Sequence, residues 1–329
     1  MTVFLLIAGG LLLLIVGGEL LVRGAVQLAE RMGVSPLLIG LTLVGFGTSA
    51  PELVTSVQAA LAGSPGIAVG NIVGSNISNI LLILGISALL APIIVSSRAL
   101  ARDGVLGVIA AAAFWAAGSL WPLDRVMGVL FLAALAAYLA YAWWQERDGS
   151  EGHTAAFDKA AAAETARAET GLAIPGAATR PGLLLSVFSA VGGLALVVFG
   201  GRFLVDGAID LARDLGISET VIGLTIVAIG TSMPELVTSV LAALRRQSEV
   251  ALGNVLGSNI YNVLGIGGAT AVMSPTVMPP EMVSFDAPVM VGASILLLVF
   301  AATGLRLSRR EGAVLLACYI AYIAVIWPK

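Results

Sequence analysis

Cysteine and histidine are almost absent from this chain of 329 residues, which has one of each, Cys318 and His153. A single cysteine excludes a disulfide within the chain. The same scarcity argues against zinc or copper centres built from these residues and against a cysteine–histidine nucleophilic pair. We expect Cys318 to be a small buried hydrophobic residue and predict no bound cofactor.

Charge is scarce too. Charged residues make up 11% of the chain, hydrophobic residues 58%, and the mean hydropathy is +1.01. Soluble proteins average about 25% charged residues. Long apolar runs predict membrane-spanning helices, and the short alternating segments of a barrel are missing. No Lys or Arg precedes Arg23, so we interpret the first run as a retained helix and not a cleaved signal peptide. We expect a lipid bilayer around the chain and no nucleic-acid partner.

The apolar runs predict an all-α membrane protein with ten transmembrane helices. The expected spans are 3–22, 36–61, 66–90, 104–121, 126–145, 183–205, 219–244, 249–272, 287–304 and 312–327. They form two five-helix repeats, 1–145 and 183–329, joined by a polar stretch at 146–182. Five spans is an odd number, so the second repeat should be inverted in the membrane relative to the first.

An internal repeat supports this division. GTSAPELVTSV begins at Gly47 and GTSMPELVTSV at Gly230, 183 residues later, and residues 40–81 match residues 223–264 at 26 of 42 positions without a gap. Each copy places an acid, Glu52 or Glu235, inside an apolar segment. A carboxylate at membrane depth is costly and indicates function.

The positive-inside rule favours an outside N-terminus. With that orientation 13 of the 17 cations face the cytoplasm, leaving Arg125, Arg202, Arg213 and Lys329 outside. Residues 146–182 then form a cytoplasmic linker. Its polar, alanine-rich composition predicts a partly disordered tether, with a surface helix as the alternative.

The repeated motif is rich in groups that can offer oxygen ligands to a cation. Thr48 and Glu52 lie four residues apart on one helix face, as do Thr231 and Glu235. Pro51, like its counterpart one residue before Glu235, should kink the helix and free main-chain carbonyls. The next span carries a second stripe of donors at i, i+4 and i+8, which consists of Asn71, Ser75 and Asn79 in one repeat and Asn254, Ser258 and Asn262 in the other. Such an all-oxygen shell suits Na⁺, Ca²⁺ or Mg²⁺.

Two carboxylates brought together near the midplane favour exchange over free diffusion. At a separation of about 5 Å they would repel by roughly 3 kcal/mol at an effective dielectric of about 20. Bound cations or protons must neutralise the site before it passes between access states. That requirement makes a carrier an antiporter.

At these motifs the chain resembles the calcium/cation antiporter superfamily, in particular prokaryotic sodium/calcium exchangers, whose alpha repeats match both copies. The resemblance covers all ten spans and implies that the first and sixth spans slide across the other eight. It also implies a set of ligands for Ca²⁺ and Na⁺, which bind as transported substrates. The implied ligands are Glu52, Glu235, Thr48, Ser49, Thr231, Ser232, Ser75, Asn79, Ser258 and Asn262, with the main-chain carbonyls of Gly45 and Ala228.

Asn262 departs from the family pattern, in which this position is commonly Asp. An amide still coordinates a cation, so exchange survives the change, but the usual stoichiometry of three Na⁺ per Ca²⁺ cannot be assumed for this chain.

The sequence thus predicts a secondary antiporter of the cell membrane that extrudes Ca²⁺ as Na⁺ enters. An H⁺/Ca²⁺ antiporter is the nearest alternative, and the hydroxyl-rich surroundings of the two acids favour Na⁺. A cation channel fits a closed, charged site poorly. An intramembrane hydrolase lacks a base beside its Ser and Thr hydroxyls. Nothing in the sequence indicates an oligomeric state.

Overall fold

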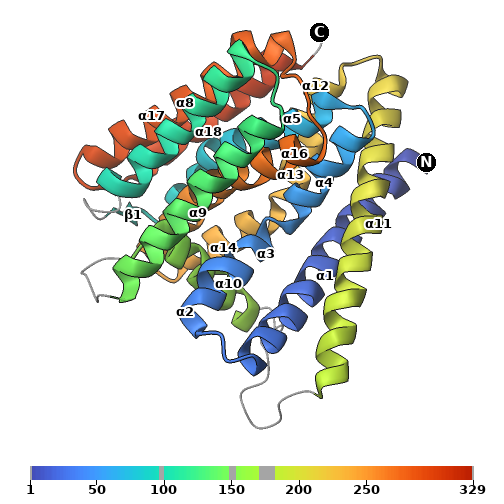
Figure 1. The fold of residues 1–329 in the computed structure, drawn as a ribbon. Coiled ribbons are helices and arrows are strands. Elements are labelled where there is room, and N and C mark those ends of the chain that lie inside the picture. Colours follow the sequence, from blue (N-terminus) through green and yellow to red (C-terminus); the bar gives the residue numbers. More distant parts are fainter. Residues whose placement is uncertain (1, 96–99, 148–152, 170–181, 328–329) are drawn as a thin grey trace.

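The computed structural model describes residues 2–95, 100–147, 153–169 and 182–327. These are almost entirely helical, with short π-helical turns, labelled η, inside several helices (Figure 1). The first half contains α1 (Thr2–Arg31), α2 (Pro36–Ile39), η1 (Gly40–Val44), α3 (Gly45–Thr48), α4 (Ala50–Leu61), α5 (Pro65–Ser78), η2 (Asn79–Leu84), α6 (Gly85–Leu90), η3 (Leu100–Gly104), α8 (Val105–Leu120) and α9 (Arg125–Arg147). The second half contains α11 (Leu183–Leu215), α12 (Glu219–Ile222), η4 (Gly223–Val227), α13 (Ala228–Thr231), α14 (Met233–Leu244), α15 (Ser248–Ile260), η5 (Tyr261–Ile266), α16 (Gly267–Met273), η6 (Met282–Asp286), α17 (Ala287–Ala302) and α18 (Arg309–Ile326). Between the halves lies α10 (Ala155–Glu169), and β1 (Ile93–Ile94) pairs antiparallel with β2 (Arg306–Leu307).

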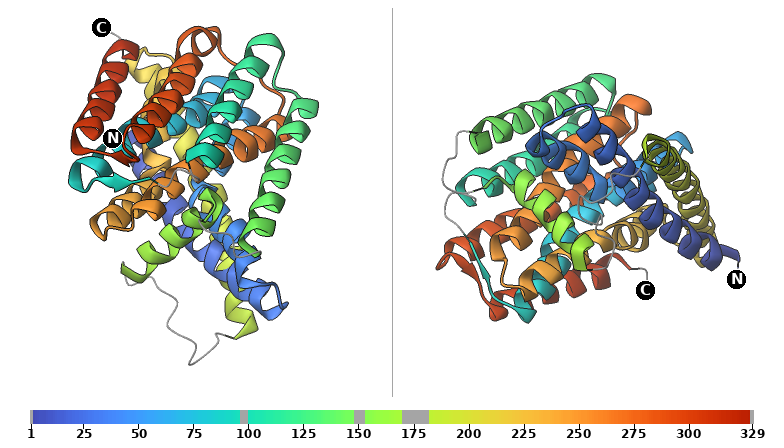
Figure 2. Two further views of the ribbon diagram at one scale, coloured as in Figure 1. Left: turned by 90° about the vertical axis from the view of Figure 1, so that its left-hand side faces the viewer. Right: turned by 90° about the horizontal axis from the view of Figure 1, so that it is seen from below.

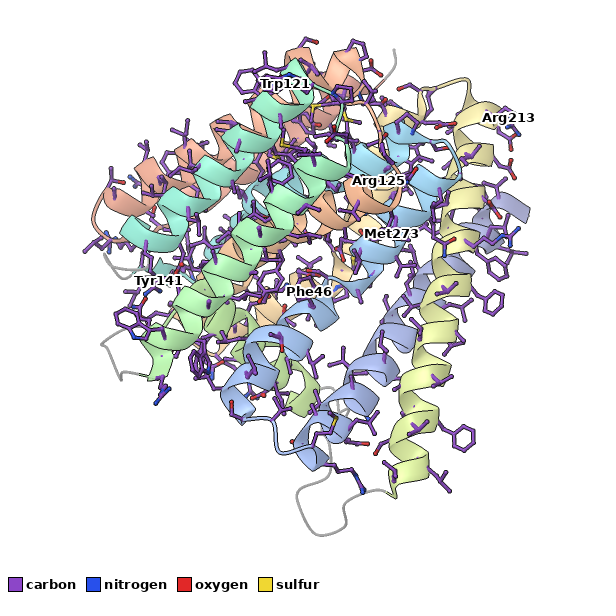
Figure 3. The ribbon with its side chains drawn as sticks, viewed as in Figure 1. Phe46, Trp121, Arg125, Tyr141, Arg213 and Met273 are labelled. Atoms are coloured by element: carbon purple, nitrogen blue, oxygen red, sulfur yellow. The ribbon has the colours of Figure 1, made fainter. Side chains whose placement is uncertain are left out.

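Among the described residues, six helical segments are long and apolar enough to cross a membrane, and two bent helix pairs raise the number to eight. The other two expected spans are helical as well, as α15 to α16 and as α18, but they do not pass the same test of length and apolar composition. Apolar side chains such as Phe4, Leu184 and Phe188 are largely exposed on α1 and α11. Figure 3 shows side chains standing out from the outer helices, with Tyr141 of α9 among them. This surface fits a multi-pass membrane protein.

Both repeated motifs contain a helix break. The segments 37–48 and 50–61 meet at 56°, and 219–231 and 233–244 meet at 51°. The breaks fall at Ser49 and Ser232, two residues before the prolines, which confirms the predicted kink. Glu52 and Glu235 therefore lie in the first turns of α4 and α14, where the helix dipole favours negative charge.

α1 and α11 pack against each other along their length and stand at one side of the molecule (Figures 1 and 2). Glycines make this packing close. A Cβ atom added to Gly24 would lie 2.3 Å from the backbone nitrogen of Ala190, and one added to Gly193 would lie 2.3 Å from that of Leu21. Backbones at this distance leave no room for a side chain between them.

The linker contains a buried helix, and the expectation of a tether is wrong for its described part. α10 packs on α15 and also contacts α14, η1 and α3. One of its faces carries small or short side chains, including Ala155, Ala162 and Ala163, each almost fully buried. Alanine favours helix formation, and its small side chain lets α10 enter the middle of the bundle. The rest of 146–182, apart from Glu146, Arg147, His153, Thr154 and Gly182, lies outside the described residues.

Candidate ion-binding site

The two acids of the repeats meet in the centre of the molecule, each beside a serine of the other repeat. Ser49 Oγ donates to Glu235 Oε1 at 3.2 Å, and Ser232 Oγ donates to Glu52 Oε1 at 3.1 Å. Glu52 is 2% exposed and Glu235 1%. Because these serines are the N-cap residues of α4 and α14, the break in each helix aims a hydroxyl at the opposite carboxylate.

Asn71 and Asn254 connect the helices that carry the two acids, α4 and α14, to the helices that follow them, α5 and α15. The Asn71 amide donates to the Glu52 carbonyl at 3.1 Å and to Ser56 Oγ at 2.9 Å. The Asn254 amide repeats the arrangement on the carbonyl of Glu235 at 3.2 Å and on Ser239 Oγ at 2.8 Å. These asparagines position the site.

The span that follows the broken helix in each repeat also contacts its counterpart in the other repeat. Asn79 Nδ2 donates to Asn259 Oδ1 at 2.9 Å, and Asn259 Nδ2 donates to the carbonyl of Asn76 at 3.2 Å. Asn79, a predicted ligand, therefore lies at the contact between the repeats, and Asn262 is buried.

Several oxygens of the site have no hydrogen-bond donor among the described residues. They are Glu52 Oε2, Glu235 Oε2, Thr48 Oγ1, Ser75 Oγ, Asn79 Oδ1, Asn254 Oδ1 and Asn262 Oδ1. Buried oxygens without a partner are costly, and a cation satisfies several of them at once. Within the described ranges no three His, Cys, Asp or Glu side chains form a metal-binding group, so any cation here relies on hydroxyl and amide oxygens beside two carboxylates.

Gly45 and Ala228, the expected carbonyl ligands, are both buried but have different neighbours. A Cβ atom on Gly45 would lie 2.9 Å from the hydroxyl of Tyr261, which donates to the carbonyl of Leu41 at 2.5 Å. The Ala228 carbonyl accepts from Thr231 Oγ1 at 3.3 Å. The first repeat has glycine here because the second repeat fills the space with a tyrosine hydroxyl.

One residue of the site escaped the sequence analysis. Lys159 of α10 is fully buried, and its Nζ lies 3.2 Å from Ser49 Oγ, 3.2 Å from Glu235 Oε1 and 2.5 Å from Ser258 Oγ. The expectation of a loop at this position is wrong, because Lys159 lies in a helix and is buried. The available signal was a lone lysine on the alanine-rich face of a segment with good helix propensity.

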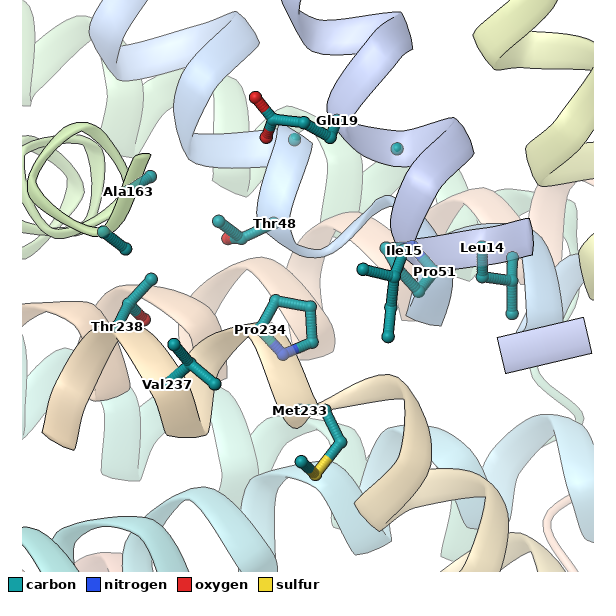
Figure 4. A pocket seen from close by; sticks show the side chains of 13 residues that line it. Leu14, Ile15, Glu19, Thr48, Pro51, Ala163, Met233, Pro234, Val237 and Thr238 are labelled. Carbon is teal, nitrogen blue, oxygen red and sulfur yellow. The ribbon is translucent and has the colours of Figure 1, made fainter. Parts of the chain in front are cut away.

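A cavity of about 310 Å³ lies beside the site, between α1, α10 and the two broken helices (Figure 4). Thr48, Pro51, Pro234 and Thr238 line it from the motifs, and Glu19 lines it from α1. Ala163 and Ala166 of α10 form one wall.

Comparison with known proteins shows which family has this arrangement. The family model described as sodium/calcium exchanger protein matches residues 2–144 and 185–327. The chain is 35% identical over 347 residues to the sodium/calcium exchanger MaX1 of Methanosarcina acetivorans, covering 98% of both chains. It is 34% identical over 327 residues to the inner membrane protein YrbG of Escherichia coli, covering 97% of this chain and 94% of YrbG. Among solved structures, the sodium-calcium exchanger NCX_Mj superposes with a TM-score of 0.62 at 31% identity, covering 99% of each chain.

Proposed function

The chain belongs to the sodium/calcium exchanger family, and from that premise we propose that it exchanges Ca²⁺ for Na⁺ across the cell membrane. It is a membrane antiporter and not an enzyme, as its relatives are exchangers. In the proposed direction of exchange, Na⁺ enters the cell as Ca²⁺ leaves.

Two hydrogen bonds between the repeats support this function, one from Ser49 to Glu235 and one from Ser232 to Glu52. Each carboxylate has one oxygen bound by a serine and one without a donor among the described residues. Ca²⁺ takes six to eight oxygen ligands, and two carboxylates surrounded by hydroxyls and amides offer that chemistry. Smaller subsets of the same oxygens can each coordinate a Na⁺ ion. The proposed ligands are Glu52, Glu235, Thr48, Ser49, Thr231, Ser232, Ser75, Asn79, Ser258 and Asn262, with the carbonyls of Gly45 and Ala228.

The alternating-access mechanism is part of the proposal. Ten spans in two inverted repeats, with the N-terminus outside, would give the site similar paths to both membrane faces. The cavity beside Thr48 and Thr238 is the proposed path on one side. α1 and α11 are the proposed moving pair, because they pack on each other more extensively than on the rest of the molecule.

Coupling to H⁺ in place of Na⁺ is the competing function, since a carboxylate binds either ion. Initial ⁴⁵Ca²⁺ uptake into proteoliposomes, with Na⁺ and pH gradients imposed separately, distinguishes the two. We expect Na⁺-loaded vesicles to accumulate Ca²⁺ when external Na⁺ is removed. Uptake that follows only the pH gradient would assign H⁺ coupling, and flux at channel-like rates without a counter-ion would contradict a carrier.

A further inference from the structure

The amine of Lys159 has the environment of a bound cation. An ammonium has three N–H donors. Three acceptors, Ser49 Oγ, Glu235 Oε1 and Ser258 Oγ, lie within 3.2 Å of Nζ. All three belong to the proposed ion ligands. The side chain is fully buried, so its charge is balanced by Glu235 and not by solvent.

Helix α10 also interrupts the symmetry of the repeats. In the first repeat, Gly74 lies against η4, and a Cβ atom there would be 2.5 Å from the Leu224 carbonyl. Its counterpart Gly257 lies against α10, where a Cβ atom would be 2.8 Å from the Ala155 carbonyl and 3.1 Å from Lys159 Cβ. Both glycines permit a close approach of another backbone, but at Gly257 the approaching segment is the linker helix and not the other repeat.

A hydrogen bond between the repeats is formed on one side of the site but, among the described residues, not at the equivalent position beside α10. Thr231 Oγ1 donates to Asn71 Oδ1 at 3.0 Å and joins the second repeat to α5. The equivalent atoms on the other side, Thr48 Oγ1 and Asn254 Oδ1, have no partner within the described part of the chain. α10 occupies the position on α15 that the repeat relation assigns to η1 and α3.

The N-terminus of α10 is bound by specific side chains. Asp103 Oδ2 accepts from the Ala155 amide at 2.9 Å, and the Tyr138 hydroxyl accepts from the Ala156 amide at 3.2 Å. Glu146 Oε1 accepts from the Thr154 amide at 2.6 Å. A carboxylate at a helix N-terminus is favourable, and these contacts hold Lys159 in register with the site.

We propose that α10 is an intramolecular inhibitor, in which the Lys159 ammonium competes with the transported cation for Glu235, Ser49 and Ser258. The inference rests on the proposed function of this site. Ca²⁺ and the ammonium cannot share Glu235 Oε1 and Ser258 Oγ, so ion binding requires α10 to withdraw. If the helix is docked nine times in ten, apparent affinity falls about tenfold.

The alternative is that Lys159 and Glu235 form a permanent structural ion pair. The accessibility of the Lys159 amine distinguishes this alternative from a reversible inhibitor. The chain has two lysines, Lys159 and Lys329, so Lys329→Arg leaves one. Amine labelling of this variant in detergent, followed by mass spectrometry, measures the reactivity of Lys159 relative to the same protein unfolded in SDS. We expect protection of at least tenfold in choline chloride and progressive loss of that protection on titration with CaCl₂ or NaCl. Full reactivity without cation, or protection that neither cation removes, would overturn the inference.

Transport supplies an independent measurement. Lys159→Gln removes the charge and keeps a long polar side chain, and Glu164→Gln, on the exposed face of α10, is its matched control. We expect Lys159→Gln to lower the Ca²⁺ concentration for half-maximal uptake about tenfold, and Glu164→Gln to leave it unchanged. An unchanged or weakened Ca²⁺ affinity in a folded Lys159→Gln protein would contradict inhibition.

The two proposals fail differently. Wild-type Ca²⁺ exchange with a freely reactive Lys159 would reject the inhibitor and retain the exchanger. A protected Lys159 released by Na⁺ alone, with no Ca²⁺ flux in either wild type or Lys159→Gln, would retain the inhibitor and reject Ca²⁺ as the substrate.

Discussion

At the scale of single residues, the site distinguishes two acids that the repeat makes equivalent. Both Glu52 and Glu235 accept from a serine of the opposite repeat, but of the two it is Glu235 that forms an ion pair with Lys159 among the described residues. The linker helix α10, which lies outside the repeats, therefore makes the two acids different, because its Lys159 balances the charge of Glu235.

We expect Glu52→Gln and Glu235→Gln each to reduce Ca²⁺ uptake at least about a hundredfold, because a lost carboxylate ligand removes well over 3 kcal/mol of Coulomb attraction to Ca²⁺. Only Glu235→Gln should also expose Lys159 to amine labelling, since a buried ammonium without its partner is unfavourable. Gel-filtration profiles establish folding. Near-normal flux in either folded variant would mean that its carboxylate is structural.

Gly45 and Tyr261 form a second contact between the repeats. Gly45→Ala places a methyl group 2.9 Å from the tyrosine hydroxyl, and overpacking of this kind costs about 1–3 kcal/mol. We expect a lower melting temperature for Gly45→Ala, and a smaller decrease when the same change is made in Tyr261→Phe. Thermal denaturation of the four proteins measures the coupling. Equal decreases in both backgrounds would show that the hydroxyl does not restrict this position.

At the scale of elements, α10 carries a titratable group of its own. Burial raises the pKa of Asp158 to about 7; His153 opposes the rise, and Glu249, Asp103 and Glu146 add to it. Once α10 withdraws, the carboxyl returns to its ordinary pKa of 3.8. The docked state therefore binds more protons between these two values, and docking weakens as pH rises through them.

From pH 6 to pH 8 this linkage weakens docking about tenfold. Arg102 lies 2.8 Å from Asp103 and stays charged over this interval, so the linkage is carried by Asp158. We expect the protection of Lys159, referred to unfolded protein at each pH, to decrease across the interval in wild type. Asp158→Asn should flatten the profile. If the two proteins share one profile, Asp158 does not control docking.

At the scale of the whole molecule, the packing separates a two-helix unit, α1 with α11, from the remaining helices. Gly201 of α11 faces Val54 of α4, with its added Cβ atom 2.7 Å from Val54 Cγ1. Gly207 of α11 faces Leu6 of α1, with the corresponding Cβ–Cβ distance 3.0 Å. One contact crosses between the units and the other lies inside the pair.

These contacts allow a test of the moving pair. In a Cys318→Ser background, we expect oxidation of Val54→Cys with Gly201→Cys to stop transport and reduction to restore it, because the disulfide ties α11 to α4. Oxidation of Leu6→Cys with Gly207→Cys should leave at least half the flux, since these helices move together. Initial Ca²⁺ uptake before and after a thiol reductant measures both. Full activity of the oxidised Val54–Gly201 pair would contradict sliding of α11 over α4.

The sequence alone determined the helical membrane class, the two repeats and the helix breaks before Pro51 and Pro234. These properties follow from hydropathy, self-similarity and backbone sterics, all of which are local. The same self-similarity identified Glu52 and Glu235 as the acids of the site, and the structure brings them together with the predicted serines.

Only the tertiary structure decided where the linker lies. A polar, alanine-rich segment has equal helix propensity on a surface and in a core, so composition did not distinguish a tether from a buried helix. The docking of α10 depends on Gly253 and Gly257 of α15, which leave space for it, and on the Glu235 carboxylate, which lies 76 residues away and compensates the charge of Lys159. A buried lysine is stable only beside its partner, and that proximity exists only in the folded chain.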